Sequence, residues 1–208
     1  MNKAIVFDLD GVLVDSKDIH FNALNLALSE YDPKYVITKI EQEHVYEGMT
    51  TKSKLEILTK KKGLPVGAYL DIWESKQNYT AKLFKSIGQD QELIVLLGII
   101  KDHGIKIGVA SNSIRETLDT CLNNLGILKF IDVSLSNEDV FSPKPDPEIY
   151  NTCIKLLGSD KDNAVIYEDS DIGREAAKAS GAHLIPVYNR SSIDLSLIQK
   201  GIKYLEQN

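Results

Sequence analysis

Cysteine is scarce in this sequence, which has only Cys121 and Cys153 among its 208 residues. The two lie far apart, each in a helix-like apolar pattern, so we interpret them as buried thiols in a reducing compartment rather than as a disulfide. Long hydrophobic runs are also missing. The longest, LIVLLGII at 93–100, is too short to cross a bilayer, and Met1 leads almost directly into a strand rather than a signal peptide. The sequence therefore predicts a cytoplasmic protein that does not insert into a membrane.

Positive charge is neither abundant nor concentrated. The chain has 24 Lys and Arg against 30 Asp and Glu, a net charge of -6, and its lysines are scattered rather than interleaved with aromatic residues. This pattern does not favour a nucleic-acid groove. A hydrophobic content of 43% is enough for a core, and the length suggests one domain or one domain with an insertion. We expect a small-molecule partner and a monomer or weak dimer.

Strand-like apolar runs alternate with helical patterns in much of the chain. The runs lie at 4–7, 105–110, 164–167 and 184–188, with a weaker one at 131–135, and most are apolar on both faces, as in a covered parallel sheet. Between them, Ser113 and Glu116 predict a capping box at the start of one helix, and Ser170 predicts the cap of another. Repetition of strand and helix predicts an α/β fold.

The stretch from 16 to 86 has helical patterns and no convincing strand. Helices are expected near 17–30, up to the segment TKKKG at 59–63, and near 67–84. We interpret the lysine run as a solvated helix C-terminus that complements the helix dipole. A helical insertion at 16–86 is therefore predicted to interrupt a core made of 1–15 and 87–208, with GQDQE at 88–92 as the return hinge.

Polar side chains follow the predicted strands at the points where the strands end. They are Asp8 and Asp10, Ser111 and Asn112, Glu168 and Asp169, and Lys144 in the loop after the weaker strand. Taken singly, these residues also fit helix caps or a solvated loop lysine. However, ligands of open parallel sheets collect at this edge, and four carboxylates there would repel one another without a divalent cation. Ligation by oxygen atoms alone suits Mg²⁺, so the sequence predicts a magnesium site.

Four segments resemble, in order and separation, the signature motifs of the haloacid dehalogenase superfamily. They are FDLDGVLVDS, VASNS, KPDPEIY and YEDSDIGREAAKASGA, and the resemblance spans residues 4 to about 187. The sequence is similar to the beta-phosphoglucomutase and phosphoglycolate phosphatase branch. The resemblance implies a Rossmann-like doubly wound parallel sheet as the catalytic core, a small helical cap inserted after the first strand, and a Mg²⁺-dependent phosphatase acting on a small phosphomonoester such as a sugar phosphate.

The resemblance also implies roles for the core residues. Asp8 would attack phosphorus to form an aspartyl-phosphate, which suits a group already ionised at neutral pH. Asp10 would act as general acid and then as general base. Lys144 would balance the charge, and Ser111 would donate to a phosphoryl oxygen with Asn112 nearby. The implied metal ligands are Asp8, Asp169, the main-chain carbonyl of Asp10 and, directly or through water, Glu168.

Candidate substrate-binding residues in the insertion are His20, Thr51 and Lys76. YEGMTTKSKLEIL at 46–58 resembles the substrate-specificity segment of the same branch, with Gly48 as its anchor. His20 also fits a polar helix residue near a hinge, and Lys76 a solvated helix lysine. Thr51 stands where beta-phosphoglucomutases carry a phosphate-binding Arg.

Two other functions remain as alternatives at this stage. A sugar phosphomutase would use the same Asp8 chemistry, although Thr51 does not favour it. A non-catalytic phosphate-binding protein would typically lack the nucleophile or a metal acid, and this chain has both. A true dehalogenase is disfavoured by Asp10, because displacement of a halide leaves no oxygen to protonate.

Overall fold

The computed structural model describes residues 1–46 and 49–207, and it divides into two compact units. The core unit is Met1–Ser16 with Ile87–Asn208, and the helical unit is Lys17–Ser86. Each unit has its own cluster of buried hydrophobic side chains. The two are therefore described separately.

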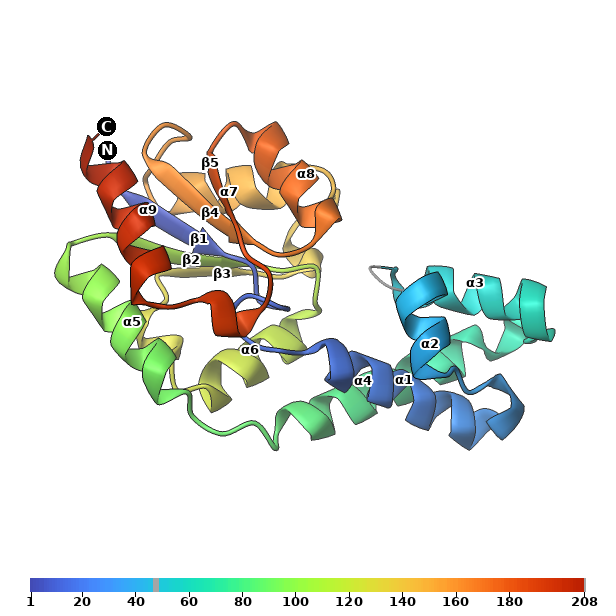
Figure 1. The fold of residues 1–208 in the computed structure, drawn as a ribbon. Helices are drawn as coiled ribbons and strands as arrows, with labels where there is room; N and C mark the ends of the chain where they lie inside the picture. The colour runs from blue at the N-terminus through green and yellow to red at the C-terminus, as the bar shows by residue number, and fades with distance from the viewer. Residues whose placement is uncertain (47–48, 208) are drawn as a thin grey trace. The chain divides into compact units, whose positions relative to one another are not determined.

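The core unit is built on a parallel sheet, which has five strands within the described residues (Figure 1). The strand order is β3-β2-β1-β4-β5. The strands are β1 (Ala4–Phe7), β2 (Lys106–Ala110), β3 (Val133–Leu135), β4 (Ala164–Glu168) and β5 (His183–Pro186). Every residue of β1 and β4 is buried, as expected for a sheet covered on both faces. The predicted α/β fold with a parallel sheet is confirmed.

Helices cover both faces of this sheet, so it is doubly wound. On one face, α7 (Glu148–Leu156) and α8 (Asp171–Ser180) bury side chains against residues of β1 and β4 such as Val6 and Ile166. On the other face, α5 (Gln91–Asp102) contacts β2, and α9 (Leu195–Gln207) contacts β4. Tyr167 marks this second face, because its hydroxyl donates to the Leu197 carbonyl of α9 at 2.9 Å. The remaining α-helix among the described residues of the core, α6, is Arg115–Asn124.

Of the two predicted caps, one is confirmed and one is wrong. The Ser170 hydroxyl accepts a hydrogen bond from Gly173 N–H at 3.0 Å and caps α8 as predicted. Helix α6 instead begins at Arg115, and its N-cap residue, Ile114, makes no side-chain cap. The Ser113 hydroxyl donates to Asp10, 2.7 Å away. The capping box predicted at Ser113 is therefore wrong. The serine hydroxyl bonds the charged carboxylate of Asp10, a stronger acceptor than a neutral group.

The helical unit contains α1 (Lys17–Tyr31), α2 (Lys39–Glu41), a π-helical turn at Gln42–Tyr46, α3 (Thr51–Lys62) and α4 (Tyr69–Phe84). Helices α1 and α4 pack against each other around a hydrophobic cluster that includes Leu24, Leu28 and Ile72. Gly63 ends α3 in the left-handed conformation, with φ of 72°. Among the described residues no helix has the length and apolarity of a membrane span. The predicted anchor, Gly48, lies outside the described residues.

Candidate active site

The hydrogen-bond ladder of the sheet continues past its strand ends and aligns the first site residues. Asp8 N–H donates to the Tyr167 carbonyl at 3.0 Å, and Ser111 N–H donates to the Leu135 carbonyl at 2.9 Å. Parallel pairing also sets Phe7 opposite both Val109 and Tyr167. Because parallel strands end at one edge, the residues that follow β1, β2 and β4 lie side by side there.

Lys144 joins two buried carboxylates at this edge. Its ammonium lies 2.6 Å from Asp8 Oδ1 and 2.8 Å from Glu168 Oε2. The side chain of Lys144 is 3% exposed, so the alternative of a solvated loop lysine is wrong. Burial by itself lowers the pKa of Lys144, but the charges of Asp8 and Glu168 outweigh that effect and raise the pKa. The lysine is therefore a fixed positive charge beside Asp8.

The two acids that share this lysine differ in electrostatic environment. Burial, and then repulsion from Glu168, raises the pKa of Asp8 well above its usual range, although Lys144 opposes the shift. Burial also acts to raise the pKa of Glu168, but Lys144 reverses that effect, and the pKa of Glu168 is lowered. The surroundings of Asp8 thus oppose its ionisation, whereas those of Glu168 favour its ionised form.

Glu168 is held by donors on both of its oxygens. Oε1 accepts from the main-chain N–H groups of Asp169 and Ser170 and from the Ser170 hydroxyl, each at 3.0 Å. Oε2 accepts from Lys144 and from the Tyr150 hydroxyl, which is 2.5 Å away. Burial, followed by the charge of Glu168, raises the pKa of Tyr150 well above its usual range, so its phenol remains a donor.

Asp10 is surrounded by serine hydroxyls. Ser16 donates to Asp10 Oδ1 at 2.5 Å, and Ser113 donates to Oδ2 at 2.7 Å. The Ser111 hydroxyl lies farther from Oδ2, at 3.5 Å, and accepts from Ser113 N–H at 2.9 Å. Donors on both oxygens therefore fix the orientation of this carboxyl.

Asn112 holds the loop that carries Lys144. Its side-chain oxygen accepts from Lys144 N–H at 3.1 Å, and its side-chain nitrogen donates to the Lys144 carbonyl at 3.3 Å. The amide thus clamps the lysine backbone on both sides. The predicted contact of Asn112 with substrate stays a prediction, while its contact with the lysine loop is a feature of the fold.

Three acids of the site lie close enough together to hold a metal ion. Carboxylate oxygens of Asp8, Glu168 and Asp169 lie within 4.8 Å of one another. Gly11 makes room for one of them, because a Cβ at Gly11 would lie 2.1 Å from Asp169 Oδ2. An all-oxygen donor set fits a hard divalent cation, and its charge would lower the raised pKa of Asp8. The residues therefore fit a metal ion, and the carbonyl of Asp10 stays a predicted additional ligand.

The other predicted substrate residues belong to the helical unit. Lys76 is 8% exposed, so the alternative of a solvated helix lysine is wrong. Its ammonium lies 3.4 Å from His20 Nδ1, and the His20 ring packs edge-on against Phe84. Thr51 is the first residue of α3 and is half-buried. The structure thus brings His20 and Lys76 together within this unit, and their role in binding substrate stays a prediction.

Three residues at the core site were missed from the sequence: Ser16, Ser113 and Tyr150. Each lies inside one of the four motif segments. Position within a motif was thus the available signal, but Ser113 also matched a helix cap, and Tyr150 matched the apolar face of α7. Neither pattern predicts which acceptor binds the hydroxyl of Ser113 or Tyr150.

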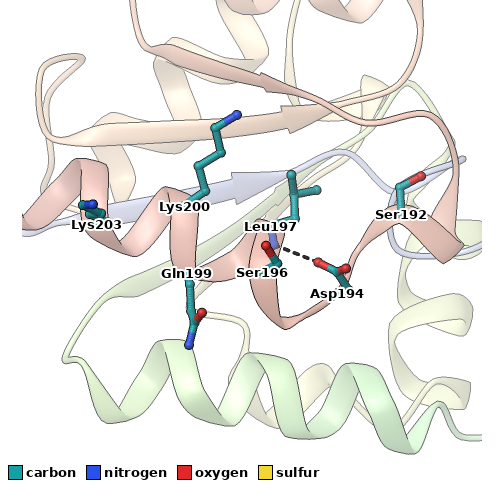
Figure 2. A pocket seen from close by; sticks show the side chains of 7 residues that line it. All are labelled: Ser192, Asp194, Ser196, Leu197, Gln199, Lys200 and Lys203. Atoms are coloured by element: carbon teal, nitrogen blue, oxygen red, sulfur yellow. Dashed lines mark hydrogen bonds between the residues drawn. The ribbon is translucent and has the colours of Figure 1, made fainter.

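Surface hollows lie elsewhere on the core unit. One lies on the outer side of α9 (Figure 2), where the Asp194 carboxylate accepts from Leu197 N–H at 2.8 Å. Lys200 and Lys203 also line it. It includes none of the acids that converge at the sheet edge, so it is a separate feature from the candidate active site.

Comparisons with known proteins agree with this geometry. The sequence profile of haloacid dehalogenase-like hydrolases matches residues 5–187. A phosphorylated carbohydrates phosphatase from Thermotoga maritima is 28% identical, over 88% of this chain and 83% of its own length. Beta-phosphoglucomutase from Clostridium difficile has the same fold, with a TM-score of 0.79 at 23% identity over 100% and 99% of the two chains. CbbY from Rhodobacter sphaeroides, solved in complex with phosphate, has a TM-score of 0.78 at 24% identity, over 91% of this chain and 89% of its own.

Proposed function

The chain belongs to the haloacid dehalogenase-like hydrolase family, and from that premise we propose that it is a Mg²⁺-dependent phosphatase of a small phosphomonoester, such as a sugar phosphate. One observation carries the proposal: buried Asp8 lies 2.6 Å from the Lys144 ammonium, at the edge where Glu168 and Asp169 converge. The Thermotoga maritima relative, named as a phosphatase of phosphorylated carbohydrates, supports the same substrate class.

Asp8 is the proposed nucleophile and Asp10 the proposed acid and base. A carboxylate oxygen of Asp8 attacks phosphorus and forms an aspartyl-phosphate, while the leaving oxygen takes a proton from Asp10. Asp10 then accepts a proton from the water that cleaves this intermediate, which releases phosphate and restores Asp8. The two acids must therefore be in different protonation states during the first step.

The neighbouring groups neutralise charge and orient the reactants. Lys144 offsets negative charge on Asp8 and on the transferring group, and the Ser111 hydroxyl donates to a phosphoryl oxygen. Asn112 keeps the lysine loop in place through its two main-chain hydrogen bonds. Mg²⁺ held by Asp8, Asp169, the Asp10 carbonyl and, directly or through water, Glu168 would neutralise phosphoryl oxygens and favour the ionised form of Asp8.

Substrate choice is proposed to come from the helical unit, as a cap domain. Its candidate binding residues are His20, Thr51 and the buried Lys76, whose cationic side chain suits an anionic or hydroxyl-rich substrate. The proposal also includes a monomer or weak dimer in a reducing cytoplasm. Cys121 and Cys153 support the reducing compartment, since both are buried free thiols.

A sugar phosphomutase is the second candidate. The fold shared with beta-phosphoglucomutase favours it, and the same Asp8 chemistry would serve both reactions. Thr51 argues against it, because a hydroxyl supplies no charge to hold a second phosphate.

Phosphate release from a panel of phosphorylated metabolites tests the proposal. We expect turnover with Mg²⁺ and none after EDTA. Asp8→Asn should lower kcat by more than about 1,000-fold, or ~4 kcal/mol of barrier, because an amide is a poor nucleophile. Asp15→Asn is the matched control, since Asp15 is an exposed acid in the same segment. Activity of Asp8→Asn within about tenfold of wild type, or no turnover by wild type across the panel, would contradict the proposal.

A further inference from the structure

Tyr150 contacts both members of the buried Lys144–Glu168 ion pair. It lies on α7, is fully buried, and donates its hydroxyl to Glu168 Oε2 at 2.5 Å. The Lys144 ammonium lies over the face of its ring, 4.6 Å from the ring centre. A single side chain therefore binds the anion through its hydroxyl and the cation through its ring.

These two contacts bear on how Lys144 is shared between its acids. The ammonium bonds Asp8 at 2.6 Å and Glu168 at 2.8 Å. Glu168 Oε2 has the Tyr150 hydroxyl as a second donor, while Oε1 is occupied by Asp169 and Ser170. The phenol thus satisfies part of the negative charge on Oε2, which reduces the pull of Glu168 on the lysine. The ring face gives the ammonium a second favourable surface.

We propose that Tyr150 is a positioning residue that keeps the Lys144 ammonium bonded to Asp8 while the ammonium is shared with Glu168. The inference rests on the proposed function, in which Lys144 offsets charge on Asp8 and on the transferring phosphoryl group. It adds a residue that touches neither substrate nor nucleophile. Asn112 fixes the lysine backbone, and Tyr150 fixes the end of its side chain.

Tyr150→Phe tests this role because it keeps the ring and removes the hydroxyl. Tyr167→Phe is the matched control: Tyr167 is also fully buried, and its hydroxyl bonds a main-chain carbonyl of α9, outside the cluster. Both variants lose one buried hydrogen bond and should lose similar thermal stability. With an aryl phosphate and Mg²⁺, Tyr150→Phe should lower kcat about tenfold with KM little changed. Tyr167→Phe should stay within about twofold of wild type.

Crystal structures of wild type and Tyr150→Phe supply a readout that does not depend on turnover. The ammonium should move toward Glu168 and lengthen its distance to Asp8 in the variant. Tyr150→Leu, which also removes the ring, should move it further and lower kcat more than Tyr150→Phe does.

Either of two results would overturn the inference: equal kcat for Tyr150→Phe and Tyr167→Phe, or a lysine that keeps its wild-type distance to Asp8. If wild type hydrolyses the aryl phosphate, such a result removes the role of Tyr150 and leaves the proposed function intact. If wild type hydrolyses nothing, the proposed function fails, and the lysine position alone decides the role of Tyr150.

Discussion

The Asp10 carboxylate is oriented by hydroxyls from two directions. Ser16 comes from the segment after β1, and Ser113 comes from the loop after β2. Both donate to the carboxylate, so together they fix its orientation at the sheet edge. An ionised Asp10 suits the second proposed step, in which it takes a proton from water, whereas the first step needs it protonated. The two serines therefore hold this carboxyl group in one direction for both proposed steps.

Asp10→Asn should separate the two steps. The amide cannot give a proton to an alkoxide leaving group, so hydrolysis of a sugar phosphate should fall by more than about 1,000-fold, or ~4 kcal/mol. Nitrophenol leaves without protonation, so nitrophenyl phosphate should still phosphorylate Asp8 slowly and leave the phosphoenzyme trapped. Rapid quench with mass spectrometry measures its amount and its site. Phosphate found on Asp10 in the wild-type enzyme would reverse the assigned roles.

At the level of single residues, the sequence predicted which core side chains lie close together better than it predicted how buried they are. Asp8, Lys144 and Glu168 could be placed together because each lies at or after the carboxyl end of a strand of one parallel sheet. The sequence did not show that Lys144 and Lys76 are buried, since lysine is usually exposed. Tyr150 was missed for a related reason: its ring belongs to the apolar face of α7, and its hydroxyl partner is distant in sequence.

Among the secondary-structure elements, Asp132 connects two strands and a helix on the β3 side of the sheet. Its carboxylate accepts from Lys101 of α5 at 2.7 Å, from Lys106 at the start of β2 at 3.0 Å, and from Ile107 N–H at 2.8 Å. Burial acts to raise the pKa of Asp132, but the hydrogen bonds from Lys101 and Ile107 N–H outweigh it, so the pKa is lowered. Folding is therefore linked to the ionised form of this acid.

Asp132→Asn should lower stability by about 2 kcal/mol at neutral pH, because it removes charge-assisted hydrogen bonds. The folded pKa lies below the unfolded value of about 3.9, so this stabilisation is present above that pH and is lost as pH falls through the folded pKa. The difference from wild type should therefore shrink below about pH 4. Urea unfolding across pH measures it, with the exposed ion-pair variant Asp119→Asn as control. A difference that stays constant down to pH 2.5 (about 1.4 units below the unfolded value) would contradict the linkage.

The elements themselves were largely predictable, and their ends were less so. Apolar runs located β1, β2 and β4 because burial on both faces leaves no polar position inside a strand. The strand predicted at 184–188 starts and ends too far along the chain, because β5 is His183–Pro186 and begins with a half-buried histidine. The predicted cap at Ser113 was wrong because an N-cap pattern describes local hydrogen bonds, whereas the Ser113 hydroxyl donates to Asp10 across the sheet edge.

For the whole molecule, we propose that the core unit catalyses the reaction and that the helical unit selects the substrate. The core unit contains the proposed nucleophile, acid, lysine and metal ligands, and its geometry can be followed from strand register. The helical unit has its own hydrophobic cluster and contains His20, Thr51 and Lys76. Sequence patterns predict its helices but not its substrate, because helical periodicity fixes the buried face and leaves the binding residues unconstrained.

The choice between phosphatase and mutase is proposed to depend on charge in the helical unit. A mutase must release a bisphosphate and rebind it while gripping the phosphate that does not react, and a bidentate arginine suits that task. Thr51 supplies no charge. Lys52 is exposed and lies about 100° around α3 from Thr51, so the two side chains face different directions. Water should therefore be the final acceptor.

Incubation with beta-glucose 1-phosphate and a trace of glucose 1,6-bisphosphate tests this choice. We expect free phosphate to be released, with little glucose 6-phosphate, because the phosphoryl group on Asp8 is transferred to water rather than back to a sugar phosphate. Thr51→Arg supplies the missing charge and should slow loss of the bisphosphate relative to wild type, whereas Thr51→Ser should not. Coupled assays for glucose 6-phosphate and for phosphate measure both products in one sample. Glucose 6-phosphate that accumulates faster than phosphate in the wild-type protein would identify a mutase, since it requires the phosphoryl group to return to sugar before water reaches Asp8.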